Sequence, residues 1–256
     1  MTGVAMFVVL FIIATAAVTT YQVVNDTRAS DIGDIFEKSA RVAEYADERL
    51  EAAAGGRELP KPPELLADQP TLQLALAMTL VTQALTLGIV GVSTRLTFGE
   101  LRRALGLERY AFRSAWRPAL AVFGAYTMVV VYAMVAEAIG IGLLEPESTV
   151  PFEITRDHLT LSIAAAVTLV GAPFSEELLF RGLVFSGLLR WGFWPAAVVS
   201  SFSFTLLHLD PGSLIPFSLI GILIAWLYWS RGTLWDSIIF HFLFNATSFT
   251  FLVWGT

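Results

Sequence analysis

The chain has 256 residues, of which 55% are hydrophobic and 15% are charged, and its mean hydropathy is +0.67. Soluble domains carry about 25% charged residues, so the composition predicts an all-α, polytopic transmembrane helix bundle. The net charge of -6 argues against nucleic acid as a partner. The chain has no cysteine, which excludes disulfides, thiolate catalysis and cysteine-ligated zinc.

About seven apolar segments are candidates for spanning helices, because a helix needs roughly 20 apolar residues to cross the hydrocarbon core. They are residues 3–24, 72–92, 118–144, 159–190, 195–209, 214–230 and 234–254. The first segment lacks the basic flank of a signal peptide and is long for a signal peptide's apolar core. We therefore expect it to be retained as an N-terminal transmembrane helix (residues 1–24).

Residues 25–70 form the one long polar segment and hold 11 of the 22 acidic residues. Apolar residues recur near helical spacing in this segment, so part of it is a candidate amphipathic surface helix. Gly55-Gly56 and the prolines of residues 60–63 then interrupt regular structure. We interpret the segment as an acidic polar linker between two spans.

Arginines concentrate in the loop at residues 95–117, in which Thr97 and Glu100 have the spacing of a helix capping box. The positive-inside rule places such a loop in the cytoplasm. Alternating crossings then put the N-terminus inside and the C-terminus outside. Glu137 is expected near the outer end of the third span, in contact with water; the alternative is a buried acid.

The segment at residues 159–190 is too long for one straight crossing. At 1.5 Å per residue, its 32 residues extend about 48 Å, whereas the hydrocarbon core is about 30 Å thick. The helix must therefore kink, tilt or protrude, and Gly171 and Pro173 are the expected kink positions. Glu176 then falls near the middle of the membrane.

This segment carries two adjacent carboxylates and an arginine. Glu177 and Arg181 are four residues apart, so they share a helix face and can pair. Glu176 lies about 100° around the helix from Glu177 and is left free to titrate. Separate environments give neighbouring carboxylates separate roles. The alternative is an ion-pair network that only braces helices.

Two of the three histidines, His208 and His241, lie in other apolar segments, and Asn245 shares a helix face with His241. A glutamate can deprotonate water, a histidine can help to hold that water, and amide and imidazole N–H groups can bind an oxyanion. Alternatively, Glu176, His208 and His241 match the ligands of a catalytic zinc site. The residues alone leave both readings open.

These residues resemble a known family. Glu176-Glu177-Leu-Leu-Phe-Arg181-Gly182, Phe204-Thr-Leu-Leu-His208 and His241-Phe-Leu-Phe-Asn245 are similar to the three motifs of the CPBP intramembrane proteases. That family includes the type II CAAX prenyl endopeptidases and the bacterial Abi proteins. The resemblance covers residues 159–250.

The resemblance implies a role for each motif residue. Glu176 would activate water with the assistance of His208, and His241 and Asn245 would stabilise the oxyanion. Glu177 and Arg181 would position the first acid, and Phe204 would pack beside the site. The family is often called metalloproteases, so a divalent metal such as zinc is one implied cofactor and a metal-free mechanism is the other possibility.

We therefore expect a spanning helix (residues 1–24), the linker (25–70), two spans with a cytoplasmic loop (71–158) and a CPBP-like catalytic core (159–256). The expected function is intramembrane hydrolysis of peptide bonds in a membrane-associated protein or peptide. The expected location is the membrane, in contact with lipid, in a bacterial inner membrane, with the site facing the cytoplasm. The alternatives are a non-catalytic bacteriocin-immunity or partner-binding protein and a transporter.

Overall fold

The computed structural model describes residues 2–24, 48, 52, 55–58, 60, 69–108, 110–141, 144, 152–208 and 210–254. Across these ranges the regular structure is helical and contains no strand, which confirms the all-α prediction. Most of residues 25–70, including the candidate surface helix and most of the linker, lie outside the described residues.

The helices closely follow the predicted apolar segments. They are α1 (Thr2–Val24), α3 (Gln69–Thr94), α4 (Phe98–Ala104), α5 (Trp116–Ile139), α6 (His158–Ala165), α7 (Ala172–Glu177), α8 (Ser186–Leu188), α9 (Phe193–Leu206), α10 (Leu214–Arg231) and α11 (Leu234–Trp254). The elements α6, α7 and α8 belong to one continuous helical stretch. Two π-helical segments, η4 (Ala166–Gly171) and η5 (Leu178–Phe185), separate them.

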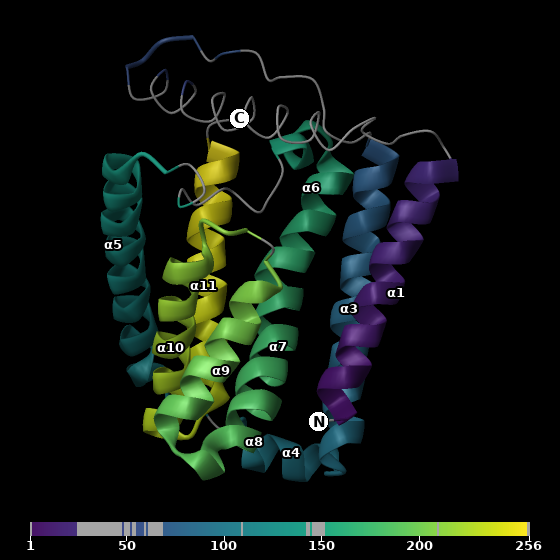
Figure 1. Cartoon of the computed structure of the whole chain (residues 1–256), viewed down its shortest axis with the longest axis vertical. Helices are drawn as coiled ribbons and strands as arrows, with labels where there is room; N and C mark the ends of the chain where they lie inside the picture. The colour runs from purple at the N-terminus through teal and green to yellow at the C-terminus, as the bar shows by residue number, and fades with distance from the viewer. Residues whose placement is uncertain are drawn as a thin grey trace.

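Within the described residues, six helices are long and apolar enough to cross a membrane. The seventh predicted span is shorter, because α9 has 14 residues and extends about 21 Å at 1.5 Å per residue. It cannot by itself cross a hydrocarbon core of about 30 Å. The N-terminal end of α1 and the C-terminal end of α11 lie at opposite ends of the bundle (Figure 1). An odd number of segments, which is obtained when α9 is counted, requires this arrangement.

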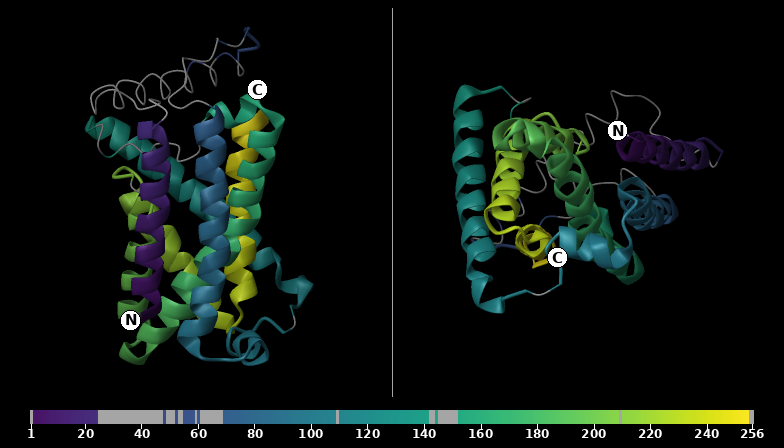
Figure 2. Two further views of the ribbon diagram at one scale, coloured as in Figure 1. Left: turned by 90° about the vertical axis from the view of Figure 1, so that its right-hand side faces the viewer. Right: turned by 90° about the horizontal axis from the view of Figure 1, so that it is seen from below.

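The long stretch from α6 to α8 runs through the bundle beside α9, α10 and α11 (Figure 2). On one side α3 packs against this stretch and α1 packs against α3. On the other side α5 packs against α10 and α11. Helices outside the three motifs therefore flank the motif-bearing helices on both sides.

The turn between α9 and α10 stops well short of the bundle end reached by α5 and α11 (Figure 1). Asp210 closes this turn, since its carboxylate accepts hydrogen bonds from the backbone N–H groups of Gly212 and Ser213 at 3.0 and 3.1 Å. His208 precedes the turn and is therefore held inside the bundle. A helix of full spanning length at this place would instead carry His208 toward the outer surface.

The loop predicted to be cytoplasmic docks onto the start of α11. The capping box of α4 forms as predicted, with Thr97 and Glu100 bonded to each other's backbone N–H. Beyond α4, the Leu105 carbonyl accepts from the Leu234 N–H at 2.9 Å. Gly106 has a φ of 63° and lies against the Gly232 backbone so closely that a Cβ would overlap it.

An apolar cluster fills this end of the bundle below the motif residues. Leu105 packs there with Phe185, Leu234 and Ile238, each at most 3% exposed. Glu137, at the opposite end of α5, is exposed and lies two residues before the end of the helix. The favoured prediction for Glu137, a position at the helix end rather than in the core, agrees with this placement.

Tyr110 provides a test of the docked loop. Its hydroxyl donates to the Asp236 carboxylate at 3.0 Å, and burial together with this acid raises the pKa of Tyr110 to about 12. The unfolded value is about 10, so the stability from protonated Tyr110 is complete below about pH 10 and is lost as the pH approaches about 12. We expect the thermal midpoint of the detergent-solubilised protein to fall across this range and Tyr110→Phe to reduce that fall. An identical alkaline fall in the variant would contradict the assignment.

Candidate active site

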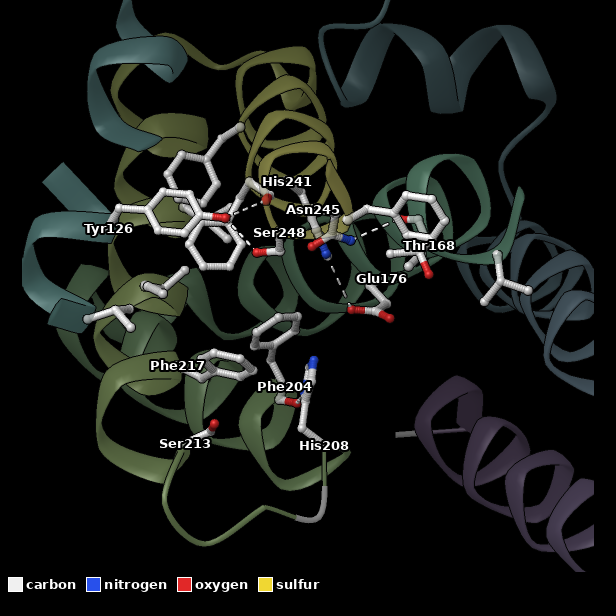
Figure 3. A pocket seen from close by; sticks show the side chains of 18 of the residues that line it. Tyr126, Thr168, Glu176, Phe204, His208, Ser213, Phe217, His241, Asn245 and Ser248 are labelled. Carbon is white, nitrogen blue, oxygen red and sulfur yellow. Dashed lines mark hydrogen bonds and ion pairs between the residues drawn. The ribbon is translucent and has the colours of Figure 1, made fainter. Parts of the chain in front are cut away.

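The three motifs meet at one cavity of about 410 Å³. Its wall includes Glu176 from α7, Phe204 and His208 from the end of α9, and His241 and Asn245 from α11. Figure 3 shows these side chains converging from the three helices. The volume is in the range of small-molecule pockets, about 300–1,000 Å³. The structure therefore brings together the residues that the sequence separates by up to 69 positions.

Glu177 and Arg181 form the ion pair predicted from their spacing. The two side chains are 0% exposed, and the Arg181 guanidinium donates to Glu177 Oε1 at 3.1 Å. A second guanidinium nitrogen donates to the backbone carbonyl of Gly221 on α10 at 3.1 Å. The guanidinium also lies 4.8 Å from the ring centroid of Phe204 on α9, which is within cation–π range.

His241 connects the two glutamates, a contact that the sequence did not reveal. Its Nδ1 lies 2.9 Å from Glu177 Oε1, and its Nε2 lies 3.9 Å from Glu176 Oε2. An ionised carboxylate only accepts hydrogen bonds, so Nδ1 carries the proton in this contact. The buried pair with Arg181 thereby orients the imidazole, and its other nitrogen faces Glu176 (Figure 3).

Glu176 is the more accessible of the two acids. Its side chain is 27% exposed and lines the cavity. Among the described residues, no hydrogen-bond partner contacts Oε2. Adjacent positions on one helix thus place one carboxylate in a closed ion pair and the other at a cavity, as the 100° angular separation predicts.

His208 presents one ring nitrogen for chemistry. Its Nδ1 lies 3.1 Å from the backbone carbonyl of Phe204, and because a carbonyl only accepts, Nδ1 is the protonated nitrogen. The neutral ring then has its free lone pair at Nε2. Phe204 and Phe217 pack against the ring with centroids 4.8 and 5.0 Å away, which fixes its orientation at the cavity wall.

Asn245 lies at the cavity, and one of its amide hydrogens is already bonded there. Its side-chain amide donates to the backbone carbonyl of Thr168 at 2.9 Å (Figure 3). One of its two amide hydrogens is therefore committed to η4, the π-helical segment before α7. The second hydrogen is the one still available for a ligand.

The cavity wall also contains polar residues that the sequence analysis missed. They are Thr79 and Gln83 of α3, Tyr126 of α5, Thr168 of η4, Ser213 at the start of α10 and Ser248 of α11. Ser248 shares a helix face with Asn245 at i,i+3 spacing, and this signal was present in the sequence. For Gln83 and Tyr126 there was no such signal, because their relation to the site arises only from packing.

The zinc alternative does not fit the donor geometry. Within the described part of the chain, no three His, Cys, Asp or Glu side chains are grouped so that they could hold a metal ion. Glu176, His208 and His241 line one cavity without forming a ligand cluster.

The buried ion pair predicts a large loss of stability when one partner is removed. Arg181→Met leaves Glu177 buried without its cation, which typically costs about 3–5 kcal/mol. We expect this change in the free energy of unfolding of the detergent-solubilised protein. Arg190→Met is the matched control, because Arg190 is exposed over the Trp191 ring and surface changes usually stay within about 0.5 kcal/mol. Equal effects of the two substitutions would contradict the structural role of the pair.

Comparison with known proteins finds a family similarity over the region that carries this site. Residues 158–247 match the family model described as Rce1-like, type II CAAX prenyl endopeptidase Rce1-like. No curated protein and no solved structure matches the chain. The match begins at the start of α6 and ends just beyond Asn245, so it contains all three motifs. Residues 158–247 are therefore an Rce1-like region, as the resemblance to the CAAX proteases predicted, in a multi-pass membrane protein.

Proposed function

We propose that the protein is an intramembrane endopeptidase in which Glu176 activates a water molecule. The observation that carries the proposal is the connected set Arg181, Glu177, His241 and Glu176 at a cavity inside an apolar bundle. Charged residues at membrane depth are costly, and they commonly mark functional sites. Here one charge pair is closed, and one carboxylate remains open to the cavity.

In the proposed mechanism, water is held between Glu176 and His208 Nε2. Glu176 takes a proton from the water while the water oxygen forms a bond to the carbonyl carbon of the peptide. The C–N bond then breaks, and Glu176 gives the proton to the departing nitrogen. The products are a carboxylate and an amine, so no oxidant or other co-reactant is needed.

The oxyanion formed in this reaction is stabilised by His241 and the remaining amide hydrogen of Asn245. His241 serves as a donor when its Nε2 is also protonated. Before the proton transfer, the charges of Glu176, Glu177, Arg181 and this doubly protonated His241 sum to zero. A neutral set is the least costly one in a low-dielectric interior, where like charges repel strongly.

We propose a membrane-associated protein or peptide as the substrate. The cavity wall is mainly apolar and includes aromatic rings from α9, α10 and α11, among them Phe204, Phe217, Phe240 and Phe244. Apolar side chains next to the scissile bond would remove these rings from water and bind by the hydrophobic effect. Polar groups from α3, α5, η4, α7 and α11 interrupt this apolar lining.

Glu176→Gln tests the proposal. The amide keeps the size of the side chain but cannot accept a proton from water, so we expect cleavage of membrane peptides to fall by about 10²–10⁴-fold. Folding should persist, because Glu176 Oε2 has no hydrogen-bond partner among the described residues and its contact with His241 Nε2 is long, at 3.9 Å. Glu137→Gln, at the exposed end of α5, is the matched control and should cleave normally. Undiminished cleavage by folded Glu176→Gln would reject Glu176 as the group that activates water.

An orientation of the site can be proposed from the difference between its two ends. The cavity continues along α11 from His241 to Leu252, whereas the apolar cluster around Leu105 and Phe185 closes the arginine-rich end. We propose, by the positive-inside rule, that the arginine-rich end is cytoplasmic. The cavity then extends away from the cytoplasm, and the expectation of a cytoplasm-facing site is not retained.

Cysteine labelling checks this orientation, since the natural chain has no cysteine to react. In sealed right-side-out vesicles, a membrane-impermeant thiol reagent should label Ser248→Cys in the cavity. Arg113→Cys, at the arginine-rich end, should react only after permeabilisation. The reverse pattern would restore a cavity that opens to the cytoplasm.

A further inference from the structure

The segment before the paired glutamates has an irregular hydrogen-bond pattern. In η4 (Ala166–Gly171) the backbone hydrogen bonds join residues five positions apart. The Ala172 N–H, for example, donates to the Val167 carbonyl. The next donor in this pattern would be the N–H of residue 173, which is a proline and has none. Such π-helical turns are rare, and they frequently occur at functional sites.

Two side-chain amides from two other helices bind consecutive carbonyls of this π-helical turn. Gln83 of α3 donates to the Val167 carbonyl at 3.2 Å, and Asn245 of α11 donates to the Thr168 carbonyl at 2.9 Å. Asn245 belongs to a motif. Gln83 lies outside the Rce1-like residues 158–247, and the three motifs do not include it.

Gly171 allows the close approach of Gln83. A Cβ at position 171 would overlap the Gln83 amide, so a larger residue there would displace it. Gln83 Oε1 is buried and has no hydrogen-bond partner among the described residues. A buried acceptor without a partner is unfavourable, so stability alone does not account for a glutamine at this position.

The π-helical turn sets the direction of the residues that follow it. It takes one residue more than an α-helical turn, and one residue corresponds to about 100° of rotation. Glu176 and Glu177 differ by this same angle. The turn therefore determines which carboxylate faces the cavity and which faces Arg181 and His241.

We propose that Gln83 is a positioning residue that, with Asn245, holds the π-helical turn and thereby directs Glu176 into the cavity. The catalytic consequence rests on the proposed peptidase function. The direction of position 176 does not, and it can be measured separately. The proposal adds α3, a helix without a motif, to the elements that build the site.

The first experiment measures the direction of position 176 by thiol reactivity. Glu176→Cys carries the only thiol in the otherwise cysteine-free chain. In this background, Gln83→Leu and Gln83→Met each remove the amide donor while keeping similar bulk. We expect either substitution to slow labelling by a small charged thiol reagent at least five-fold. Unchanged labelling in both would overturn the proposal.

Thr79→Val is the matched control in the same background. Thr79 also lines the cavity and lies one turn from Gln83 on α3, but its hydroxyl donates to the Ala75 carbonyl in its own helix. We expect its labelling rate to equal that of the parent. Thermal midpoints of all variants are measured in parallel. If a lower midpoint of the Gln83 variants accounts for their slower labelling, the role of Gln83 is merely structural and the proposal is overturned.

The second experiment measures cleavage in chains that retain Glu176. Gln83→Leu should lower kcat about ten-fold and leave KM within two-fold, because the acid is misdirected while the cavity persists. Unchanged kcat would overturn the positioning role in catalysis. If cleavage proves independent of Glu176 while labelling still depends on Gln83, the proposed catalytic role of Glu176 fails and the positioning of residue 176 stands.

Discussion

The buried ion pair between Glu177 and Arg181 is the interaction on which the rest of the site depends. Both side chains are 0% exposed, so each charge requires compensation that neither lipid nor water provides at this depth. Arg181 obtains it from Glu177, a carbonyl of α10 and the Phe204 ring of α9. Glu177 obtains it from Arg181 and from His241 of α11. One pair of charges therefore joins the helices that carry all three motifs.

The same pair separates the roles of two neighbouring acids. Glu177 is occupied by two partners, and its bond to His241 Nδ1 turns the other ring nitrogen toward Glu176. Glu176 itself remains at the cavity, 27% exposed. A carboxylate with room for water and an oriented imidazole beside it is the arrangement from which general base catalysis can proceed.

Irregular helix geometry makes this arrangement possible. The π-helical segments η4 and η5 lie directly before and after α7, which carries the glutamates. The short helix α9 places His208 inside the bundle rather than at its surface. An ideal helix of full spanning length at either place would rotate or shift the functional side chains away from one another. The side-chain amides of Gln83 and Asn245 show how the irregular backbone is stabilised in a dry environment.

The sequence by itself predicted the membrane class, the apolar segments, the Glu177–Arg181 pair and the convergence of the motifs. These features depend on local quantities: segment hydropathy, helical spacing and the cost of charge in lipid. Only the tertiary structure decided the length of α9, the bond between His241 and Glu177, and the hydrogen bonds of Asn245 and Gln83 to η4. Each depends on which atoms of separate helices come within hydrogen-bond distance. Helical periodicity fixes the direction of a side chain on its own helix, but it does not fix the depth and rotation of the neighbouring helices.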